Sequence, residues 1–291
     1  MKICSACNAR FDSSGWDCPA CGHVPPQLNG FPALAAELAN SSDGFHPEYF
    51  EQLASLEAGN FWFQSRNTLI LLLLKRHCPT LKSFLEIGCG TGFVLSGVAS
   101  AFPSASLVGA EIHSTGLQYA AHRVPRAQFM QMDARKIPFE SHFDALGAFD
   151  VLEHIEEDTI VLAQLNQALK PGGTLILTVP QHPLLWSSQD EMACHVRRYT
   201  ATELKQKVSS AGFDIVDSGS FVALLLPLMW LSRRFDKTSK DGRHDPMAEL
   251  RIGWIANRIL SAFMFVELMF TRIGVRFPVG GSLFLVARKR S

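Results

Sequence analysis

Residues 84–92 read Phe-Leu-Glu-Ile-Gly-Cys-Gly-Thr-Gly, and this stretch decides the fold. Residues 83–87 predict a buried strand, the three glycines predict a tight turn, and residues 93–101 begin a helical pattern. A glycine turn lets a ligand lie against the backbone, and the helix behind it offers free N–H groups. The stretch therefore predicts a strand–turn–helix unit that binds a small molecule, with a turn that binds no ligand as the alternative.

The spacing of the glycines separates the possible ligands. A dinucleotide fingerprint is Gly-x-Gly-x-x-Gly, but here the third glycine comes one residue early and Phe93 takes its place. Glu86 before the turn would repel a pyrophosphate and would favour a sulfonium and an α-amino group. The pattern resembles the S-adenosylmethionine loop of class I methyltransferases. This resemblance implies cofactor contacts from Glu86, Gly88, Cys89, Gly90 and Gly92.

Two further strands are predicted to end in acids. Residues 106–111 end in Glu111, about 20 residues beyond the turn, where an acid can accept hydrogen bonds from both ribose hydroxyls. An acid that caps the next helix is the alternative. Residues 128–134 contain Asp133, which the resemblance places at the adenine amino group, with the N–H of Ala134 at a ring nitrogen. Ile112 joins this predicted cofactor set.

The fourth predicted strand, residues 143–150, delivers Phe149, Asp150 and Val151 to the carboxyl edge of the sheet, where open α/β sheets bind ligands. The following Leu-Glu-His-Ile run matches the family and makes His154 the first candidate for proton chemistry; a histidine that only bonds the backbone is the alternative. A helix at 158–168, a Pro-Gly-Gly turn and a strand at 174–180 complete a resemblance that covers residues 83–180.

The loop after this strand, from Gln181 to Thr200, is expected to cover the methyl acceptor, and we call it the acceptor loop. It ends at a capping box formed by Thr200 and Glu203, and its histidines, arginines and aromatic residues exceed what a connection needs. We expect His182 or His195 near the nucleophile, with a plain surface loop as the alternative. The N-terminal helical segment resembles the one that lies over the cofactor pocket in many small-molecule methyltransferases, which implies that Arg66 holds the methionine carboxylate. An amphipathic helix packed on the sheet, with Arg66 in solvent, is the alternative. The predicted acceptor contacts are Trp62, Trp186, Arg198 and Tyr199.

Two Cys-x-x-Cys pairs stand near the N-terminus, at Cys4 and Cys7 and at Cys18 and Cys21. Four thiolates in two tight turns complete a tetrahedral shell for zinc. The segment resembles a zinc ribbon, and its low apolar content predicts that metal binding and folding are one event. A closed site of this kind is structural. A redox dithiol or loose thiols are the alternatives.

Composition limits the class of protein. The 291 residues hold 47% apolar residues and equal numbers of basic and acidic residues, 27 of each, so no basic field favours nucleic acid. No apolar leader is seen at the N-terminus, and no apolar run was expected to be long enough to span a membrane. The predicted organisation is a zinc ribbon at 1–26, a linker and helical lid at 27–75, and a methyltransferase domain at 76–291.

Between the last two predicted strands lies an apolar insert, residues 221–279. Two helices fit its pattern, at 221–231 and 252–273, joined by a basic-leaning stretch at 232–244. The insert favours contact with a membrane surface or a lipid substrate, with a dimer interface or extra core as alternatives. Similar apolar attachments occur in quinone-biosynthesis methyltransferases, which this chain resembles in its core.

Together these patterns predict an α/β protein with a Rossmann-like, seven-stranded sheet whose last strand is antiparallel. The resemblance implies transfer of a methyl group from S-adenosylmethionine to a hydrophobic or lipid-linked small molecule. We expect a cytoplasmic protein, peripheral on the inner face of the membrane. An RNA methyltransferase that grips RNA with its ribbon and a non-catalytic cofactor-binding subunit are the two alternatives.

Overall fold

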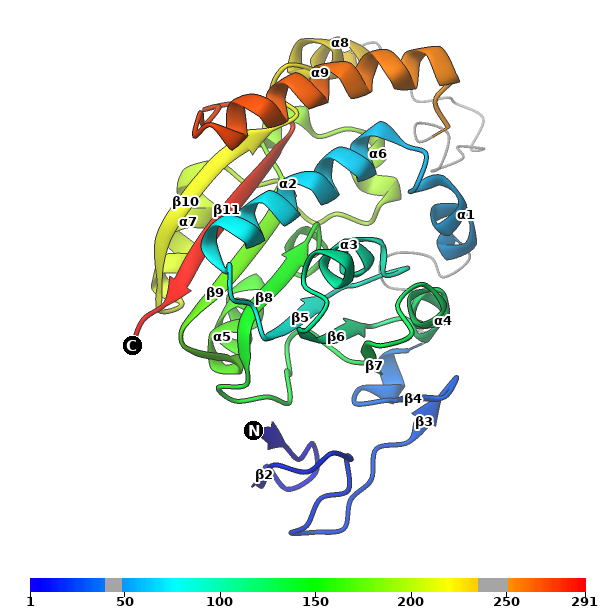
Figure 1. Cartoon of the computed structure of the whole chain (residues 1–291), viewed down its shortest axis with the longest axis vertical. Coiled ribbons are helices and arrows are strands. Elements are labelled where there is room, and N and C mark those ends of the chain that lie inside the picture. Colours follow the sequence, from blue (N-terminus) through cyan, green and yellow to red (C-terminus); the bar gives the residue numbers. More distant parts are fainter. Residues whose placement is uncertain (40–48, 235–250) are drawn as a thin grey trace.

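The computed structural model describes residues 1–39, 49–234 and 251–291. Its centre is a seven-stranded sheet in the order β10-β11-β9-β8-β5-β6-β7, drawn in Figure 1. The five strands from β9 to the edge strand β7 pair in parallel, while β11 runs antiparallel to β9 and β10. The predicted sheet with an antiparallel last strand is therefore confirmed. The strands are β5 (Ser83–Ile87), β6 (Ser106–Glu111), β7 (Gln128–Gln131), β8 (Phe143–Phe149), β9 (Leu169–Pro180), β10 (Phe213–Phe221) and β11 (Ser282–Lys289).

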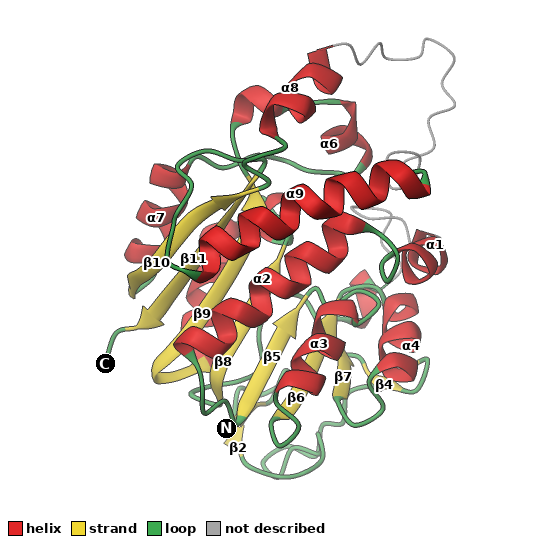
Figure 2. Ribbon diagram, turned by 45° about the horizontal axis from the view of Figure 1, so that its top comes forward, coloured by secondary structure: helices red, strands yellow, loops and turns green. Residues whose placement is uncertain are grey.

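Helices cover both faces of this sheet, as Figure 2 shows. Side chains alternate along each strand, so Phe84 packs with α2 and α3 on one face and Leu85 packs with α5 and α7 on the other. Both faces are apolar because parallel strands are buried on both sides. The helices are α2 (Phe61–His77), α3 (Phe93–Ala101), α4 (Ser114–Arg123), α5 (Asp158–Ala168) and α7 (Ala201–Ser210).

One strand begins earlier than the sequence indicates. The Pro-Gly-Gly stretch was expected to form a turn before a strand at residue 174, but β9 already begins at Leu169. Leu169 pairs with Phe143 and Thr174 pairs with Ala145, so the residues between them form an irregularity inside the ladder. Gly172, with φ +70°, provides the backbone conformation that this irregularity needs.

The N-terminal segment packs on the edge of the domain. Short hairpins form from β1 (Lys2–Ile3) with β2 (Arg10–Phe11) and from β3 (Gln27–Leu28) with β4 (Phe31–Pro32). The first hairpin docks through the Ile3 N–H, which donates to the Pro138 carbonyl at 2.9 Å, and through an edge contact between Trp16 and Phe139. A bridge from Ala33 to Gln131 extends the sheet beyond β7. Residues 40–48 of the predicted linker lie outside the described residues.

The predicted insert contains two helices, α8 (Leu226–Arg234) and α9 (Trp254–Arg272), and α9 lies along α2 (Figure 2). The expected basic stretch falls mainly at 235–244, outside the described residues. Contrary to expectation, α9 is long and apolar enough to cross a membrane by length and composition alone. The smaller helices are η1 (Ala36–Leu38), α1 (Tyr49–Leu56), η2 (Leu152–His154), η3 (Pro183–Leu185) and α6 (Ser188–Met192).

Candidate active site

The glycine turn after β5 needs its glycines for two separate reasons. Gly88 and Gly90 have φ values of +67° and +52°, in the left-handed region where side chains are strained. A Cβ at Gly88 would also lie 2.5 Å from Cγ2 of Val151, whereas a Cβ at Gly90 would meet only Phe50, at 3.8 Å. The turn is thus packed on one side and open on the other, which leaves its backbone accessible to a ligand.

Glu111 ties the turn to the end of β6. Its carboxylate accepts hydrogen bonds from the N–H groups of Gly90 at 3.0 Å, Ile112 at 2.9 Å and His113 at 3.3 Å. Burial raises the pKa of Glu111, and the charge of His113 and these N–H groups act against that rise. The predicted ribose acid is therefore held rigidly beside the glycine turn.

Glu86 is buried with one unsatisfied oxygen. The residue is 2% exposed, and its Oε2 has no hydrogen-bond partner among the described residues. Burial raises the pKa of Glu86 well above its usual range, while the charge of Arg66 acts in the opposite direction. A carboxylate in this state favours a cationic partner, and the amino and sulfonium groups of S-adenosylmethionine are of that kind. The residues around the turn thus fit this cofactor.

Other predicted cofactor residues are engaged with protein partners in this structure. Asp133 accepts from the Arg135 side chain at 3.0 Å and from its N–H at 2.8 Å. Arg66 donates to Asp150, and its guanidinium carbon lies 4.4 Å from the ring centroid of Trp62. Asp133 and Arg66 can therefore meet a ligand only by sharing or exchanging these partners.

One cavity of about 1520 Å³ opens along the carboxyl ends of the strands. Of the predicted residues, the cavity is lined by Trp62, Arg66, Glu86, Gly88, Cys89, Gly90, Glu111, Ile112, Asp133, Ala134, Phe149, Asp150, Val151, His154, His195 and Arg198. The sequence patterns thus predicted a set of residues that the fold brings together, although the role of each remains a prediction.

Two segments, η2 and the residues after α6, meet at one side of this cavity. The rings of His154 and His195 lie 4.8 Å apart, and Nδ1 of His195 lies 2.9 Å from Oδ1 of Asp190. Arg198 donates to the same oxygen at 2.7 Å. Burial, followed by the charge of His195, lowers the pKa of His154 to about 4, so this imidazole is neutral at neutral pH.

The sequence reasoning missed Glu153, which is fully buried and lies 4.0 Å from Nε2 of His195. The only available signal was its place before His154 in an otherwise apolar run.

Comparison with known proteins identifies the family. Residues 59–218 match the model of a protein family that is described as a methyltransferase domain. This chain belongs to that family. The chain is 23% identical over 169 residues to a probable S-adenosylmethionine-dependent methyltransferase of Mycolicibacterium smegmatis. This match covers 57% of this chain and 64% of that protein. A Mycobacterium tuberculosis protein of the same description is 25% identical over 173 residues, or 58% of this chain and 62% of that protein. The chain thus spans less than two thirds of both relatives.

A shorter match and two solved structures extend the comparison. A fatty-acid O-methyltransferase of M. smegmatis is 30% identical over 100 residues, 33% of this chain and 36% of that protein. Haemonchus contortus phosphoethanolamine N-methyltransferase 2 has a TM-score of 0.57 and 20% identity, covering 88% of this chain and 60% of that one. A [4+2]-cyclase has a TM-score of 0.51 and 21% identity, covering 77% and 81%. At these identities the two structures show a common fold alone.

Four predicted residues do not line this cavity. Tyr199, expected at the acceptor, is 0% exposed, and its hydroxyl donates to Asp158 at 2.7 Å. Trp186 is 39% exposed, with its indole N–H directed to Glu191. His182 and Gly92 have structural contacts through their backbones. The His182 N–H donates to the Tyr199 carbonyl, and Gly92 is the N-cap residue of α3. Tyr199 thus fixes the loop, because its side chain points into the core.

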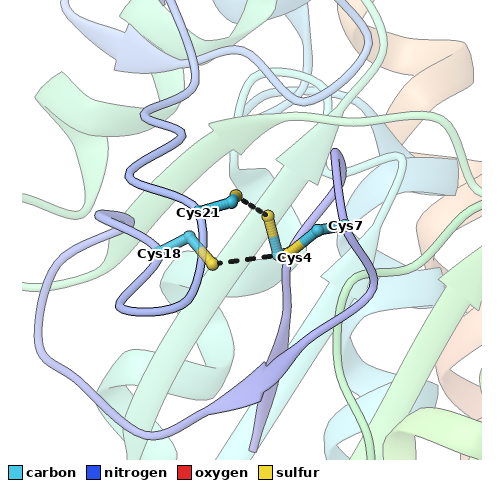
Figure 3. Close-up of side chains that lie close together, drawn as sticks. All are labelled: Cys4, Cys7, Cys18 and Cys21. Carbon is cyan, nitrogen blue, oxygen red and sulfur yellow. Dashed lines mark hydrogen bonds between the residues drawn. The ribbon is translucent and has the colours of Figure 1, made fainter.

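The four N-terminal cysteines converge, as Figure 3 shows. The sulfurs of Cys4 and Cys21 lie 3.7 Å apart, and so do those of Cys7 and Cys18. A tetrahedral zinc ion with Zn–S bonds of about 2.3 Å requires sulfurs about 3.8 Å apart. The cluster therefore has the size of a four-thiolate zinc site.

Proposed function

We propose that this chain transfers a methyl group from S-adenosylmethionine to a hydrophobic or lipid-linked small molecule. The observation that carries the proposal is one continuous cavity that extends from the glycine turn to the apolar insert. At one end it is lined by Glu86, Gly90 and Glu111, and at the other by Leu225, Leu228, Met229 and Leu260 from α8, α9 and the residue before α8. A polar donor end that continues into an apolar acceptor end suits a hydrophobic acceptor.

The polar end has a group for each part of the cofactor. Glu86 would face the cationic part, Glu111 the ribose and Asp133 the adenine, while Arg66 would exchange Asp150 for the methionine carboxylate. When bound, S-adenosylmethionine supplies an activated methyl group. The protein then has to align donor and acceptor and to exclude water. A hydroxyl acceptor must also lose a proton, and His154 and His195 are the imidazoles at that end.

The exposed face of α9 supports a membrane-surface location. Only 17% of its most apolar stretch is buried, unlike the core helix of a soluble domain. Its exposed apolar residues are Trp254, Ile255, Ile259, Phe263, Phe265, Val266, Met269 and Phe270. Glu267 is fully buried and accepts from the N–H groups of Ala223 and Leu224, so α9 is fastened to the domain and lies over it. We therefore favour a cytoplasmic protein, peripheral on the inner face of the membrane.

Among the alternatives, RNA methylation has less support. The only basic side chains of the ribbon are engaged within the protein: Lys2 donates to the carbonyls of Ser13, Ser14 and Gly15, and Arg10 pairs with Glu140. The ribbon also packs at the end of the domain away from α8 and α9 (Figure 1). We assign it structural zinc on the spacing of its four sulfurs.

A non-catalytic subunit is the other alternative. A [4+2]-cyclase with this fold illustrates that the fold alone does not define methyl transfer. The buried, unsatisfied Glu86 favours an intact cofactor site, which a non-catalytic subunit would share. Turnover is therefore the property that separates the two.

The test uses S-adenosylmethionine with a labelled methyl group. Purified protein is incubated with cell extract, which is then separated into organic-soluble, RNA, protein and small aqueous fractions. Label in the organic phase is the expected result. Label in RNA would overturn the acceptor class, and cofactor binding without labelled product would favour a non-catalytic subunit.

A second experiment tests the membrane surface. The double variant Ile255→Ser with Phe265→Ser should sediment less with anionic lipid vesicles than the native chain. Ile160→Ser is the control, because Ile160 is 48% exposed on α5, which packs in the core on the other face of the sheet from α9. Equal sedimentation of all three proteins would contradict the assignment.

A further inference from the structure

We propose that Glu153, His154 and His195 form a binding site for a divalent transition-metal ion at the acceptor end of the cavity. Each side chain offers one ligand atom, and these atoms all lie within 4.8 Å of one another. η2 supplies Glu153 and His154, and the segment after α6 supplies His195. All three line the cavity, so an ion held here would be open to an incoming molecule.

Glu153 is the residue whose buried charge a bound cation would balance. It is 0% exposed, and within the described part of the chain neither carboxylate oxygen has a hydrogen-bond partner. The nearby guanidinium groups are already paired, Arg66 with Asp150 and Arg198 with Asp190. A buried carboxylate without a partner is strongly unfavourable unless a proton or a cation neutralises it, and a metal ion would do so by displacing the proton.

The two histidines have free ligand atoms in suitable positions. Nδ1 of His195 is held by Asp190 at 2.9 Å, which leaves Nε2 directed towards Glu153, 4.0 Å away. A carboxylate that holds the far nitrogen of a ligating histidine is a common second layer of metal sites. Nδ1 of His154 is buried without a hydrogen-bond partner in the described residues. Two unsatisfied ligand groups thus lie beside an oriented imidazole.

The backbone holds the two segments together. The Val196 N–H donates to the Glu153 carbonyl at 2.7 Å, and the His195 N–H donates to the Asp190 carbonyl at 2.8 Å. Metal–ligand bonds of about 2.0–2.2 Å put neighbouring ligand atoms about 3.0–3.5 Å apart. The ligand atoms lie within 4.8 Å of one another, with 4.0 Å between Nε2 of His195 and Oε1 of Glu153, so the side chains would have to move closer together to bind one ion.

The ligand set selects the class of ion. Two imidazoles and one carboxylate suit Zn²⁺ or Fe²⁺, whereas Mg²⁺ prefers oxygen ligands. Three protein ligands leave an open position, as in catalytic zinc sites. An acceptor oxygen in that position would be oriented by the ion, and a bound hydroxyl would lose its proton more readily. The ion would then do what a histidine base would otherwise do.

The test counts zinc ions in the full chain after saturation with Zn²⁺ and gel filtration. The native chain should hold about one zinc ion per chain more than Glu153→Gln, whatever the ribbon contributes. His182→Gln is the matched control, because His182 does not line the cavity, and it should retain the native count. The count needs neither cofactor nor acceptor, so its failure would leave the proposed methyl transfer untouched.

If Glu153→Gln does not fold, His195→Gln takes its place, because the His195 side chain is 16% exposed and less enclosed. Added Zn²⁺ should also raise the melting temperature of the native chain more than that of a folded variant. Equal zinc counts and equal stabilisation in the native chain and the folded variants would overturn the site.

Discussion

Glu86→Gln should make the cofactor-free protein more stable and its cofactor affinity weaker. The substitution keeps the shape of the side chain and removes a charge that is 2% exposed and has one unsatisfied oxygen. An unsatisfied buried polar group costs about 1–3 kcal/mol, and more if it is charged. Relief of that cost should raise the melting temperature by about 2–4 °C per kcal/mol for a chain of this size.

The affinity should change in the opposite direction. A hydrogen bond between charged groups contributes about 1.5–3 kcal/mol, so loss of the carboxylate should weaken binding about 10- to 150-fold. Calorimetry with S-adenosylhomocysteine measures this, because the product keeps the amino group of the methionine part. Glu37→Gln is the control, since Glu37 is exposed on η1.

The effect on stability should depend on pH with a definite sign. Burial raises the pKa of Glu86 above its value in the unfolded chain. The folded protein therefore takes up the proton more readily, and its stability falls as pH rises through the folded pKa. The advantage of Glu86→Gln should grow from pH 5 to pH 8. A variant that is less stable than the native chain at pH 8, with unchanged affinity, would refute the reasoning.

Three further predictions concern other residues. Tyr199→Phe should lower the free energy of unfolding, measured in urea, by about 1.5–3 kcal/mol, because the hydrogen bond to Asp158 is lost. Its affinity for S-adenosylhomocysteine should not change; unchanged stability with weaker affinity would show that Tyr199 contacts the ligand. Gly88→Ala should abolish most cofactor binding, because its Cβ would lie 2.5 Å from the Val151 side chain. A native affinity for S-adenosylhomocysteine, measured by calorimetry, would contradict this. Burial raises the pKa of Asp158, but the hydrogen bonds from Lys207 and Tyr199 outweigh burial, so the pKa lies below its ordinary value. The stabilisation from Asp158 is therefore present above about pH 4 and is lost as pH falls through the folded pKa. Thermal melts of Asp158→Asn should therefore show a weaker loss of stability in acid than the native chain.

The sequence predicted most of the sheet because its strands are apolar runs bounded by glycine, proline or acids. It also predicted the acids at the ends of β5 and β6, since their positions follow from the order of strand and turn. It could not predict side-chain directions in the acceptor loop. Tyr199 turns inward because Asp158, on α5, offers a buried acceptor, and that partner is 41 positions away. Glu153 was missed because an acid inside an apolar run gives no sign of whether it faces core or cavity.

The acceptor loop is better described as a fixed wall than as a lid. The Tyr199 N–H donates to the Pro180 carbonyl, the His182 N–H to the Tyr199 carbonyl, and the Val196 N–H to the Glu153 carbonyl, all within 3 Å. Asp158 adds ion pairs to Arg197 and Lys207. Opening this loop would break several buried bonds together, so the loop sets the position of His195 and leaves access to other parts of the cavity. Apolar walls of the cavity come from α1, α8 and α9, through side chains such as Phe50, Leu228 and Leu260. An apolar acceptor that enters along these helices would reach a histidine and a carboxylate whose positions the loop has already fixed.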